Sequence, residues 1–134
     1  MFKRIAQKLR PNNPTYFDRI RIEYGEILSQ TECESILFFI RPNLEWGGSL
    51  NRAVLQMAGP ALDEYVLENI PRPKCGEVYA LPPCNAPYKA LFMAVLADWD
   101  GGIGYEERDL LNCYRETIEK AQIRGIKSVA IAAM

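Results

Sequence analysis

Two long apolar runs dominate the pattern of hydrophobic and polar residues along the chain. Residues 35–40 (SILFFI) and 128–134 (SVAIAAM) are almost continuously apolar, which is typical of strands buried on both faces of a sheet. Residues 77–81 and 90–96 are also strand-like. Residues 17–25 alternate apolar and polar positions loosely, as in a strand with one wetter face. The pattern therefore predicts a sheet with several buried strands.

Between these runs, apolar residues recur three and four positions apart, which indicates helices. One helix begins at Ser49, a second covers residues 61–70 after the break at Gly59-Pro60, and the clearest covers residues 106–124. We expect this last helix to bury one apolar stripe, formed by Leu110, Leu111, Tyr114, Ile118 and Ala121.

Strands that alternate with helices predict an α/β fold, a three-layer α/β/α domain with a mixed, largely parallel central sheet. The 134 residues are enough for one domain, which we place at residues 15–134. Residues 1–14 are predicted to be a basic helix and a Pro-containing linker. The apolar residues of this helix share one face, so we expect it to pack on the domain rather than to bind a membrane surface or a partner.

Composition and charge exclude several classes of function. The formal net charge is −1, so no overall basic field favours nucleic acid. No apolar run approaches the ~18 residues of a membrane span, and the N-terminus lacks the apolar core of a signal peptide. We therefore expect a cytoplasmic protein without a membrane or nucleic-acid partner.

Cysteine and histidine usage limits the chemistry further. The four cysteines show no CxxC spacing, so we expect reduced thiols. The chain has no histidine, which removes the commonest general base and most zinc sites. Asp98 and Asp100 lie beside Gly101-Gly102 and read as an ordinary polar loop. No metal and no cofactor are expected.

The stretch RPNLEWGGSLNRAV, residues 41–54, is the main candidate site. Ligands of α/β sheets bind at the carboxyl ends of the strands, where residues 25–27 and 41–50 should meet. Gly47 and Gly48 either let backbone N–H groups approach a phosphate at the helix start or only form a tight turn. Arg41 either holds an anion or lies at the surface, and we expect Trp46 to pack on the fold.

The order of these segments resembles the macro domain, the ADP-ribose-binding family, from about Arg21 to Met134. In that family a first strand ends in Gly-Asp-Ile, and a second runs into Asn-Ala-Ala-Asn, a loop and a Gly-Gly-Gly-Val helix start. The segments of this chain that are similar to the family are each short, so the resemblance depends on their order and spacing. The similar segments here are Tyr24-Gly25-Glu26-Ile27, Phe38-Phe39-Ile40-Arg41, Gly47-Gly48-Ser49-Leu50, Ala58-Gly59-Pro60-Ala61-Leu62, Cys75-Gly76-Glu77, Pro87-Tyr88-Lys89, Leu111-Asn112-Cys113-Tyr114 and Gly125-Ile126-Lys127-Ser128-Val129-Ala130.

Four positions depart from the family's pattern at its functional residues. Arg41 stands where the family has the Asn that faces the distal ribose, and Phe38 where another Asn supports the loop. Asn51 replaces an acidic residue of one hydrolase group, and Leu55 replaces a histidine. Arginine offers only donors, whereas asparagine offers a donor and an acceptor. We therefore expect no hydrolase activity and no catalytic residue.

The resemblance also implies how a ligand is held. Glu26 is similar to the Asp that accepts a hydrogen bond from adenine, although it is alternatively a solvated surface acid. In the family, a Ser-Thr-Gly loop that wraps the diphosphate, a helix and a strand follow the strand similar to residues 128–134. The sequence stops at Met134 and leaves open whether the natural protein does. The expected ligand-binding residues are Glu26, Ile27, Arg41, Gly47, Gly48, Ser49 and Leu50.

Taken with these departures, the resemblance favours a module that binds ADP-ribose or a related nucleotide or anion weakly. If the natural protein also ends at Met134, half of the phosphate cradle is missing, and a sheet edge or face should be uncovered and favour a homodimer or another partner. The alternatives are an ADP-ribose (phosphate) hydrolase of the macro family and an interaction scaffold without a small ligand. The replaced residues weigh against the hydrolase, and Gly47, Gly48 and Glu26 weigh for the binding module over the scaffold.

Overall fold

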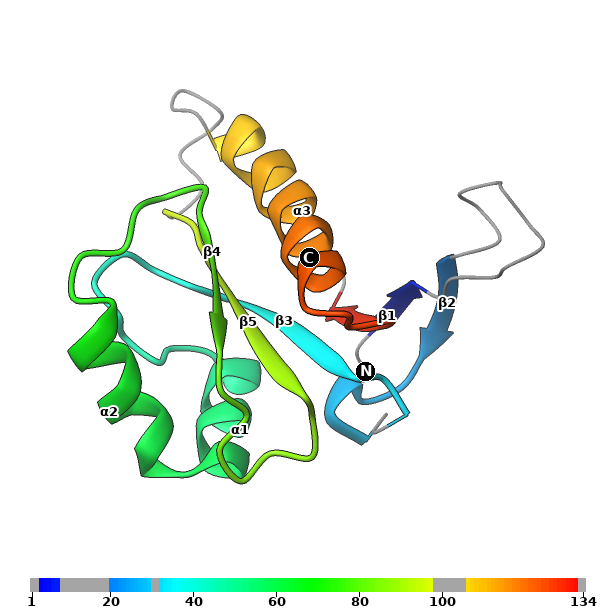
Figure 1. The fold of residues 1–134 in the computed structure, drawn as a ribbon, viewed down its shortest axis with the longest axis horizontal. Helices are drawn as coiled ribbons and strands as arrows, with labels where there is room; N and C mark the ends of the chain where they lie inside the picture. The colour runs from blue at the N-terminus through cyan, green and yellow to red at the C-terminus, as the bar shows by residue number, and fades with distance from the viewer. Residues whose placement is uncertain (1–2, 8–19, 30–31, 98–105, 133–134) are drawn as a thin grey trace.

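A computed structural model describes residues 3–7, 20–29, 32–97 and 106–132 of the chain (Figure 1). Asp98, Asp100 and the loop that contains them lie outside the described residues. The elements, in chain order, are β1 (Lys3–Gln7), β2 (Ile20–Tyr24), the 3-10 helix η2 (Ile27–Ser29), β3 (Ser35–Ile40), α1 (Ser49–Ala58), α2 (Pro60–Asn69), β4 (Val78–Leu81), β5 (Ala90–Val95), α3 (Glu106–Ile123) and β6 (Val129–Ala132).

The described strands form one six-stranded sheet in the order β2-β1-β6-β3-β5-β4. At its centre, β3 runs parallel to both β5 and β6, so that Ile36 lies opposite Leu91 on one side and Ala130 on the other. The outer strands β1, β2 and β4 pair antiparallel with their neighbours. The predicted mixed sheet is confirmed, but its parallel pairs are confined to the centre.

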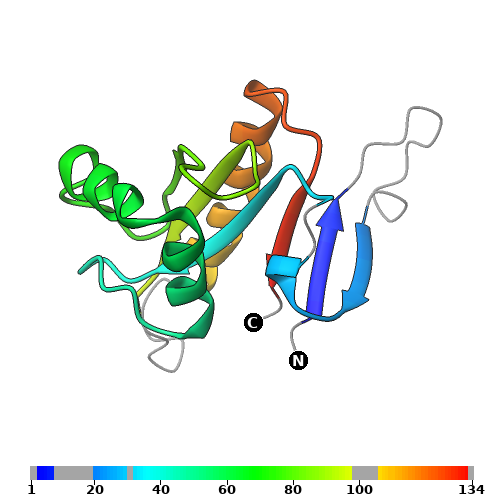
Figure 2. The same cartoon turned by 90° about the horizontal axis from the view of Figure 1, so that it is seen from below.

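Alternate residues of the central strands pack on opposite helical layers, because successive side chains of a strand point to opposite faces. Ile36, Phe38 and Ile40 of β3 lie in the cluster that includes α1 and α2 residues, whereas Leu37 lies in the cluster that includes α3 residues. Figure 2 shows α1 and α2 on one side of the β3–β5 region and α3 on the other. The predicted three-layer α/β/α architecture is confirmed.

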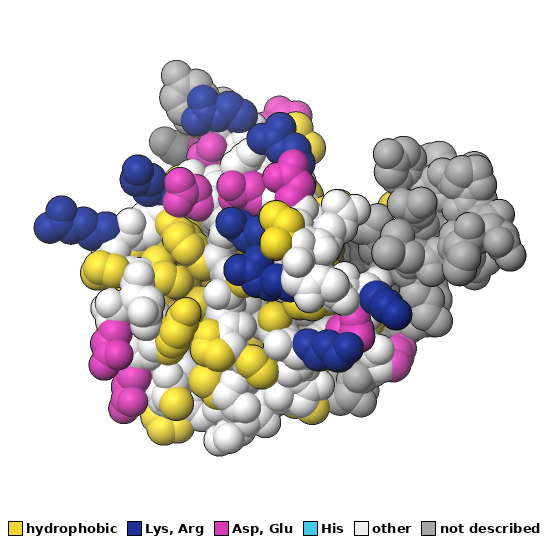
Figure 3. Space-filling view, in the orientation of Figure 1, with side chains coloured by type: hydrophobic (Ala, Val, Ile, Leu, Met, Phe, Trp, Pro, Cys, Tyr) yellow, Lys and Arg dark blue, Asp and Glu magenta, His cyan; other side chains and the backbone are white. Residues whose placement is uncertain are grey.

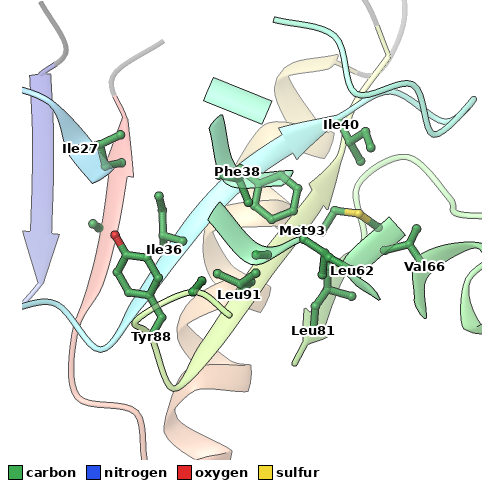
Figure 4. Close-up of a cluster of buried hydrophobic side chains, with 14 of the residues drawn as sticks. Ile27, Ile36, Phe38, Ile40, Leu62, Val66, Leu81, Tyr88, Leu91 and Met93 are labelled. Carbon is green, nitrogen blue, oxygen red and sulfur yellow. The ribbon is translucent and has the colours of Figure 1, made fainter. Parts of the chain in front are cut away.

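The core on the α1 and α2 side is centred on Phe38. Figure 4 shows its ring between β3, β5 and the helices, near Met93 and Leu62. All three side chains are fully buried. Burial of such side chains stabilises a fold by about 1.5–3 kcal/mol each, so this cluster fixes α1 and α2 on the sheet.

Glu34 joins the amino ends of the three central strands. Its carboxylate accepts hydrogen bonds from Lys89 Nζ at 2.5 Å and from the backbone N–H of Lys127 at 2.6 Å. Its own backbone N–H donates to Ser128 Oγ at 2.8 Å. Glu34 precedes β3, Lys89 precedes β5, and Lys127 and Ser128 precede β6, so the strands are held in register at the end opposite their carboxyl termini.

The predicted N-terminal helix is wrong. Lys3–Gln7 form strand β1, which pairs antiparallel with β2 on one side and β6 on the other. A short helix is marginal on its own, and two ladders of backbone hydrogen bonds outweigh the helical spacing of the apolar residues. The N-terminus therefore belongs to the sheet, and residues 3–7 belong with the domain placed at residues 15–134.

The predicted stripe on α3 is also wrong in part. The buried residues of α3 are Cys113, Thr117 and Ala121, and these small side chains let the helix lie close to the sheet. The predicted Leu111 and Ile118 are 63% and 38% exposed. The buried face is thus rotated from the most apolar face.

β4 lies at one edge of the described sheet. Beside it is an open groove of about 420 Å³ between α2 and the end of α3, and Figure 3 shows apolar side chains gathered over β4 and α2 with Lys and Arg next to them. At the start of β4, the backbone N–H of Val78 donates to the Glu116 carboxylate at 2.8 Å. The homodimer through an uncovered edge or face stays a prediction.

Candidate functional site

A cavity of about 570 Å³ lies at the carboxyl ends of β3 and β5. One wall comes from the end of β3, the following turn and the start of α1. The other wall comes from the end of β5 and the start of α3. The described residues that line it are Phe39, Ile40, Arg41, Glu45, Gly47, Gly48, Asn51, Leu96, Ala97, Glu106 and Leu110.

A tight turn places Arg41 at the rim of the cavity. The backbone N–H of Leu44 donates to the Arg41 carbonyl oxygen at 2.9 Å, and Leu44 has a φ of 62°. That value lies in the left-handed region, which is uncommon for a residue other than glycine. The chain therefore reverses immediately after β3, and the exposed Arg41 stays beside the strand end.

Trp46 fixes the next part of the turn to the core. Its indole Nε1 donates to Asp63 Oδ1 of α2 at 2.8 Å, and its ring stacks on Phe38 with ring centroids 5.6 Å apart. The expectation that Trp46 packs on the fold is confirmed. Since Trp46 directly precedes Gly47, these contacts hold the glycine turn in place.

Gly47 and Gly48 are glycines for different reasons. Gly48 is the N-cap of α1 and has a φ of 89°, a conformation that side chains disfavour. Gly47 is not among the glycines with positive φ, and a Cβ built on it meets nothing within 4 Å. Neither backbone conformation nor packing within the described residues requires glycine at position 47, which leaves close approach by a ligand as a reason.

The two helices that begin at the cavity differ in how their N-termini are satisfied. α1 has no side-chain cap and no acidic residue in its first turn. The first turn of α3 carries Glu106, Glu107 and Asp109. Because the first N–H groups of a helix lack partners inside it and attract negative charge, the α1 end of the cavity is the favourable place for an anion.

Asn51 and Leu55 serve the structure of α1. Asn51 is buried, and its Nδ2 donates to the Phe39 carbonyl oxygen at 2.7 Å, which joins α1 to the end of β3. Leu55 packs against the core cluster on the α1 and α2 side. The positions that resemble a hydrolase acid and histidine thus hold an amide that donates to the backbone and an apolar group that packs on the core.

The structure brings together some of the predicted site residues. Arg41, Gly47 and Gly48 line the cavity, whereas Ser49 and Leu50 form the first turn of α1 outside the lining. Glu26 is exposed and the Ile27 side chain is 1% exposed in the core, and neither lines the cavity. Their contact with a ligand stays a prediction.

Sequence reasoning missed the second wall of the cavity. Leu96 and Ala97 follow β5, and Glu106 and Leu110 lie in the first turns of α3. The rule that ligands bind at strand carboxyl ends applies equally to residues 90–96, so Leu96 and Ala97 could have been found. Glu106 and Leu110 could not, because their approach depends on how α3 crosses the sheet.

The chemistry of the described lining is limited. Its ionisable groups are Arg41, Glu45 and Glu106, and it holds no thiol, hydroxyl or ammonium side chain. Within the described ranges, no three Cys, Asp or Glu side chains converge as a metal site would require. No helix in that part of the chain is both long and apolar enough to cross a membrane. The lining is suited to hydrogen bonding and charge recognition.

Comparisons with known proteins agree with the fold. The family model of the Macro domain matches residues 41–134. A macro domain-containing protein of Methanosarcina mazei is 33% identical over 119 residues, which cover 87% of this chain and 62% of that protein. A protein of an Enterobacter species named O-acetyl-ADP-ribose deacetylase is 29% identical over 119 residues, covering 87% of this chain and 66% of that protein.

Solved structures are similar as well. The Oceanobacillus iheyensis macrodomain with ADP matches with a TM-score of 0.70 at 22% identity, covering 92% of this chain and 65% of that one. The Trypanosoma brucei macrodomain in complex with ADP matches with a TM-score of 0.59 at 21% identity, covering 72% of this chain and 39% of that one. The chain therefore spans less than two-thirds of the length of each of these four proteins.

Proposed function

The chain belongs to the macro domain family, and we propose that it is a binding module that holds ADP-ribose or a related nucleotide or anion weakly and without hydrolase activity. The observation that carries this proposal is the cavity of about 570 Å³ at the carboxyl ends of β3 and β5. Its size falls in the ordinary range of about 300–1,000 Å³ for small-molecule sites.

The diphosphate is proposed to bind at the start of α1. The uncapped first turn of α1 leaves N–H groups that can donate to phosphate oxygens. Gly47 leaves room beside the backbone, and Arg41 supplies the cation on this wall. Two related structures with ADP, from Oceanobacillus iheyensis and Trypanosoma brucei, support a nucleotide of this class.

The proposed absence of hydrolase activity rests on three residues of α1 and of the turn before it. Asn51 is engaged with the Phe39 carbonyl oxygen, and Leu55 packs on the core. Arg41 stands where the family has an asparagine, and its guanidinium cannot accept a hydrogen bond from a ribose hydroxyl. A chain with these residues can hold a nucleotide without positioning a water molecule for attack.

The weak affinity proposed for ADP-ribose rests on the charged groups of the described cavity lining. The two carboxylates in the lining oppose a diphosphate, and Arg41 is the single lining cation among the described residues. Each charged hydrogen bond that this lining does not offer to a diphosphate costs about 1.5–3 kcal/mol. Two such bonds fewer move a dissociation constant from ~1 μM to ~100 μM or weaker.

Calorimetric titration with ADP-ribose tests the proposal. We expect a dissociation constant of ~100 μM or weaker, and we expect Gly47→Val to abolish binding. Because a Cβ at Gly47 meets nothing, the melting temperature of this variant should stay near that of the parent, which separates lost binding from lost folding. A constant at or below ~1 μM that is unaffected by Gly47→Val would overturn both the affinity and the site.

Activity is tested separately. Release of ADP-ribose from a modified protein should not exceed the control without protein. Turnover well above that control, abolished by a change at Gly48 or Arg41, would favour the hydrolase instead.

A further inference from the structure

The cavity lies between the first turns of two helices that come from opposite faces of the sheet. Gly48 caps α1 and Glu106 is the first residue of α3, and both line the cavity. The α1 end offers N–H groups without an acidic partner in the first turn. The α3 end presents a carboxylate to the cavity. The two ends therefore differ in the sign of the charge that they favour.

The carboxylate of Glu106 acts over the whole cavity. A sphere of about 570 Å³ is roughly 10 Å across, close to the Debye length at physiological salt. Glu106 is half-buried, so its field inside the cavity is screened less than that of an exposed side chain. Among the described lining residues, the exposed Glu45 adds a second carboxylate at the rim, and Arg41 is the one cation.

The neighbouring acids of α3 do not share this position. Glu107 follows Glu106 in the same turn but is exposed and lies outside the cavity lining. Both carboxylates favour the N-terminus of α3 to a similar degree. Of the acidic residues in the first turn of α3, Glu106 is the one that lines the cavity.

We infer that Glu106 makes the cavity selective for the charge of its ligand. The α1 end accepts one anionic group, such as a diphosphate, and the α3 end accepts a hydroxyl or a cationic group and rejects a further phosphate. A carboxylate accepts hydrogen bonds from hydroxyl and ammonium groups, whereas it repels a phosphate across the cavity. The inference rests on the proposed function and narrows its ligand. The cavity should accept ADP-ribose whose distal ribose carries free hydroxyls or a cationic group. It should reject ADP-ribose that carries a phosphate ester on the distal ribose.

Titrations with two probes test the inference: ADP-ribose and its phosphate monoester on the distal ribose. The parent chain should bind the monoester at least ~10-fold more weakly than ADP-ribose. In Glu106→Gln, this difference should shrink to ~2-fold or less. Glu107→Gln removes an equal charge from the same helical turn and should keep the parent's preference. Added salt should reduce the difference in the parent, because it screens the repulsion.

The outcomes separate the inference from the proposed function. If the parent chain binds neither probe, the proposed function is overturned, and the inference falls with it. If the parent binds ADP-ribose and the monoester equally, or if Glu106→Gln keeps the full preference, the inference alone is overturned. If Glu107→Gln removes the preference as completely as Glu106→Gln, the general field of α3 is responsible, and the assignment to Glu106 is wrong.

Discussion

The indole Nε1 of Trp46 donates a hydrogen bond of 2.8 Å to the carboxylate of Asp63, which ties the loop before α1 to α2. Because the indole also stacks on Phe38 and Trp46 is half-buried, we expect Trp46→Ala to lower the free energy of unfolding by about 3 kcal/mol, the low end for a buried tryptophan. Trp46→Phe keeps a ring on Phe38 and should cost about 1 kcal/mol. Urea denaturation measures both. Asp63→Asn keeps an acceptor oxygen and should cost least, and a larger loss than for Trp46→Ala would contradict this assignment.

Introducing an acid at position 51 should destabilise the protein. In Asn51→Asp, the carboxylate would face the Phe39 carbonyl oxygen to which Asn51 now donates, and two acceptors would meet in a buried place. We expect a loss of about 1–3 kcal/mol at neutral pH. Protonation of the new side chain supplies a donor, so its pKa should be raised in the folded state. The stability deficit should then be small below the ordinary aspartate pKa of about 3.9 and grow as the pH rises above it.

Asn69 provides a matched control for this change. Its Nδ2 donates to the Tyr65 carbonyl oxygen at 2.9 Å in an exposed position. Asn69→Asp should change the free energy of unfolding by less than about 0.5 kcal/mol, as for most surface substitutions. Equal losses for the two variants, measured by urea denaturation, would refute the buried role of Asn51.

Arg41 is expected to contribute to anion binding. Arg41→Gln removes the cation from the wall of the cavity, and a charged hydrogen bond is worth about 1.5–3 kcal/mol. ADP-ribose affinity, measured by calorimetry, should fall by at least ~10-fold. Arg52→Gln is the control, because Arg52 is exposed on α1 and lies outside the lining. Tighter binding by Arg41→Gln would instead show that Arg41 obstructs the ribose.

Glu34 should make the fold sensitive to acid. Its hydrogen bond with Lys89 and that with the Lys127 backbone hold the pKa of the Glu34 carboxyl below its ordinary value of 4.5. A lowered folded-state pKa stabilises the fold above pH 4.5, and this stabilisation is lost as the pH falls through the lowered value. Glu34→Gln should cost about 1 kcal/mol at neutral pH and flatten the decline in melting temperature below pH 4.5. Glu119→Gln, an exposed change on α3, should leave the profile unaltered.

The four cysteines are free thiols, as expected from their spacing, and should differ in reactivity. Burial, with the charges of Glu116 and Asp109, raises the pKa of the Cys113 thiol to about 12. Since the thiolate is the nucleophile, iodoacetamide at mildly alkaline pH should label the exposed Cys75 and Cys84 in the native protein and spare Cys113. Mass spectrometry of the labelled peptides, with the urea-unfolded chain as the control, measures this. Native labelling of Cys113 at the rate of Cys75 would be inconsistent with its burial.

Elements with a local or strongly apolar signal could be predicted from the sequence. The run at residues 35–40 became β3, buried between two helical layers. The helical spacing after Ser49 became α1, because the same residues that form its apolar face also pack on the sheet. The placement of Gly47 and Gly48 at a helix start beside a strand end also followed from order along the chain, since strand carboxyl ends collect at one edge.

Features that depend on residues distant in the sequence could not be predicted and became visible in the folded chain. Lys3–Gln7 form a strand because β2 and β6 supply backbone hydrogen-bond partners on both sides. The spacing of apolar residues within residues 3–7 does not indicate these partners. α3 buries Cys113 and Thr117 rather than Leu111 because close approach to the sheet favours small side chains. Glu106 reaches the cavity of Gly48 because α1 and α3 start at the same edge of the sheet from opposite faces. The approach of the two helices depends on how the layers pack, so the position of Glu106 at the cavity could be found only from the folded chain.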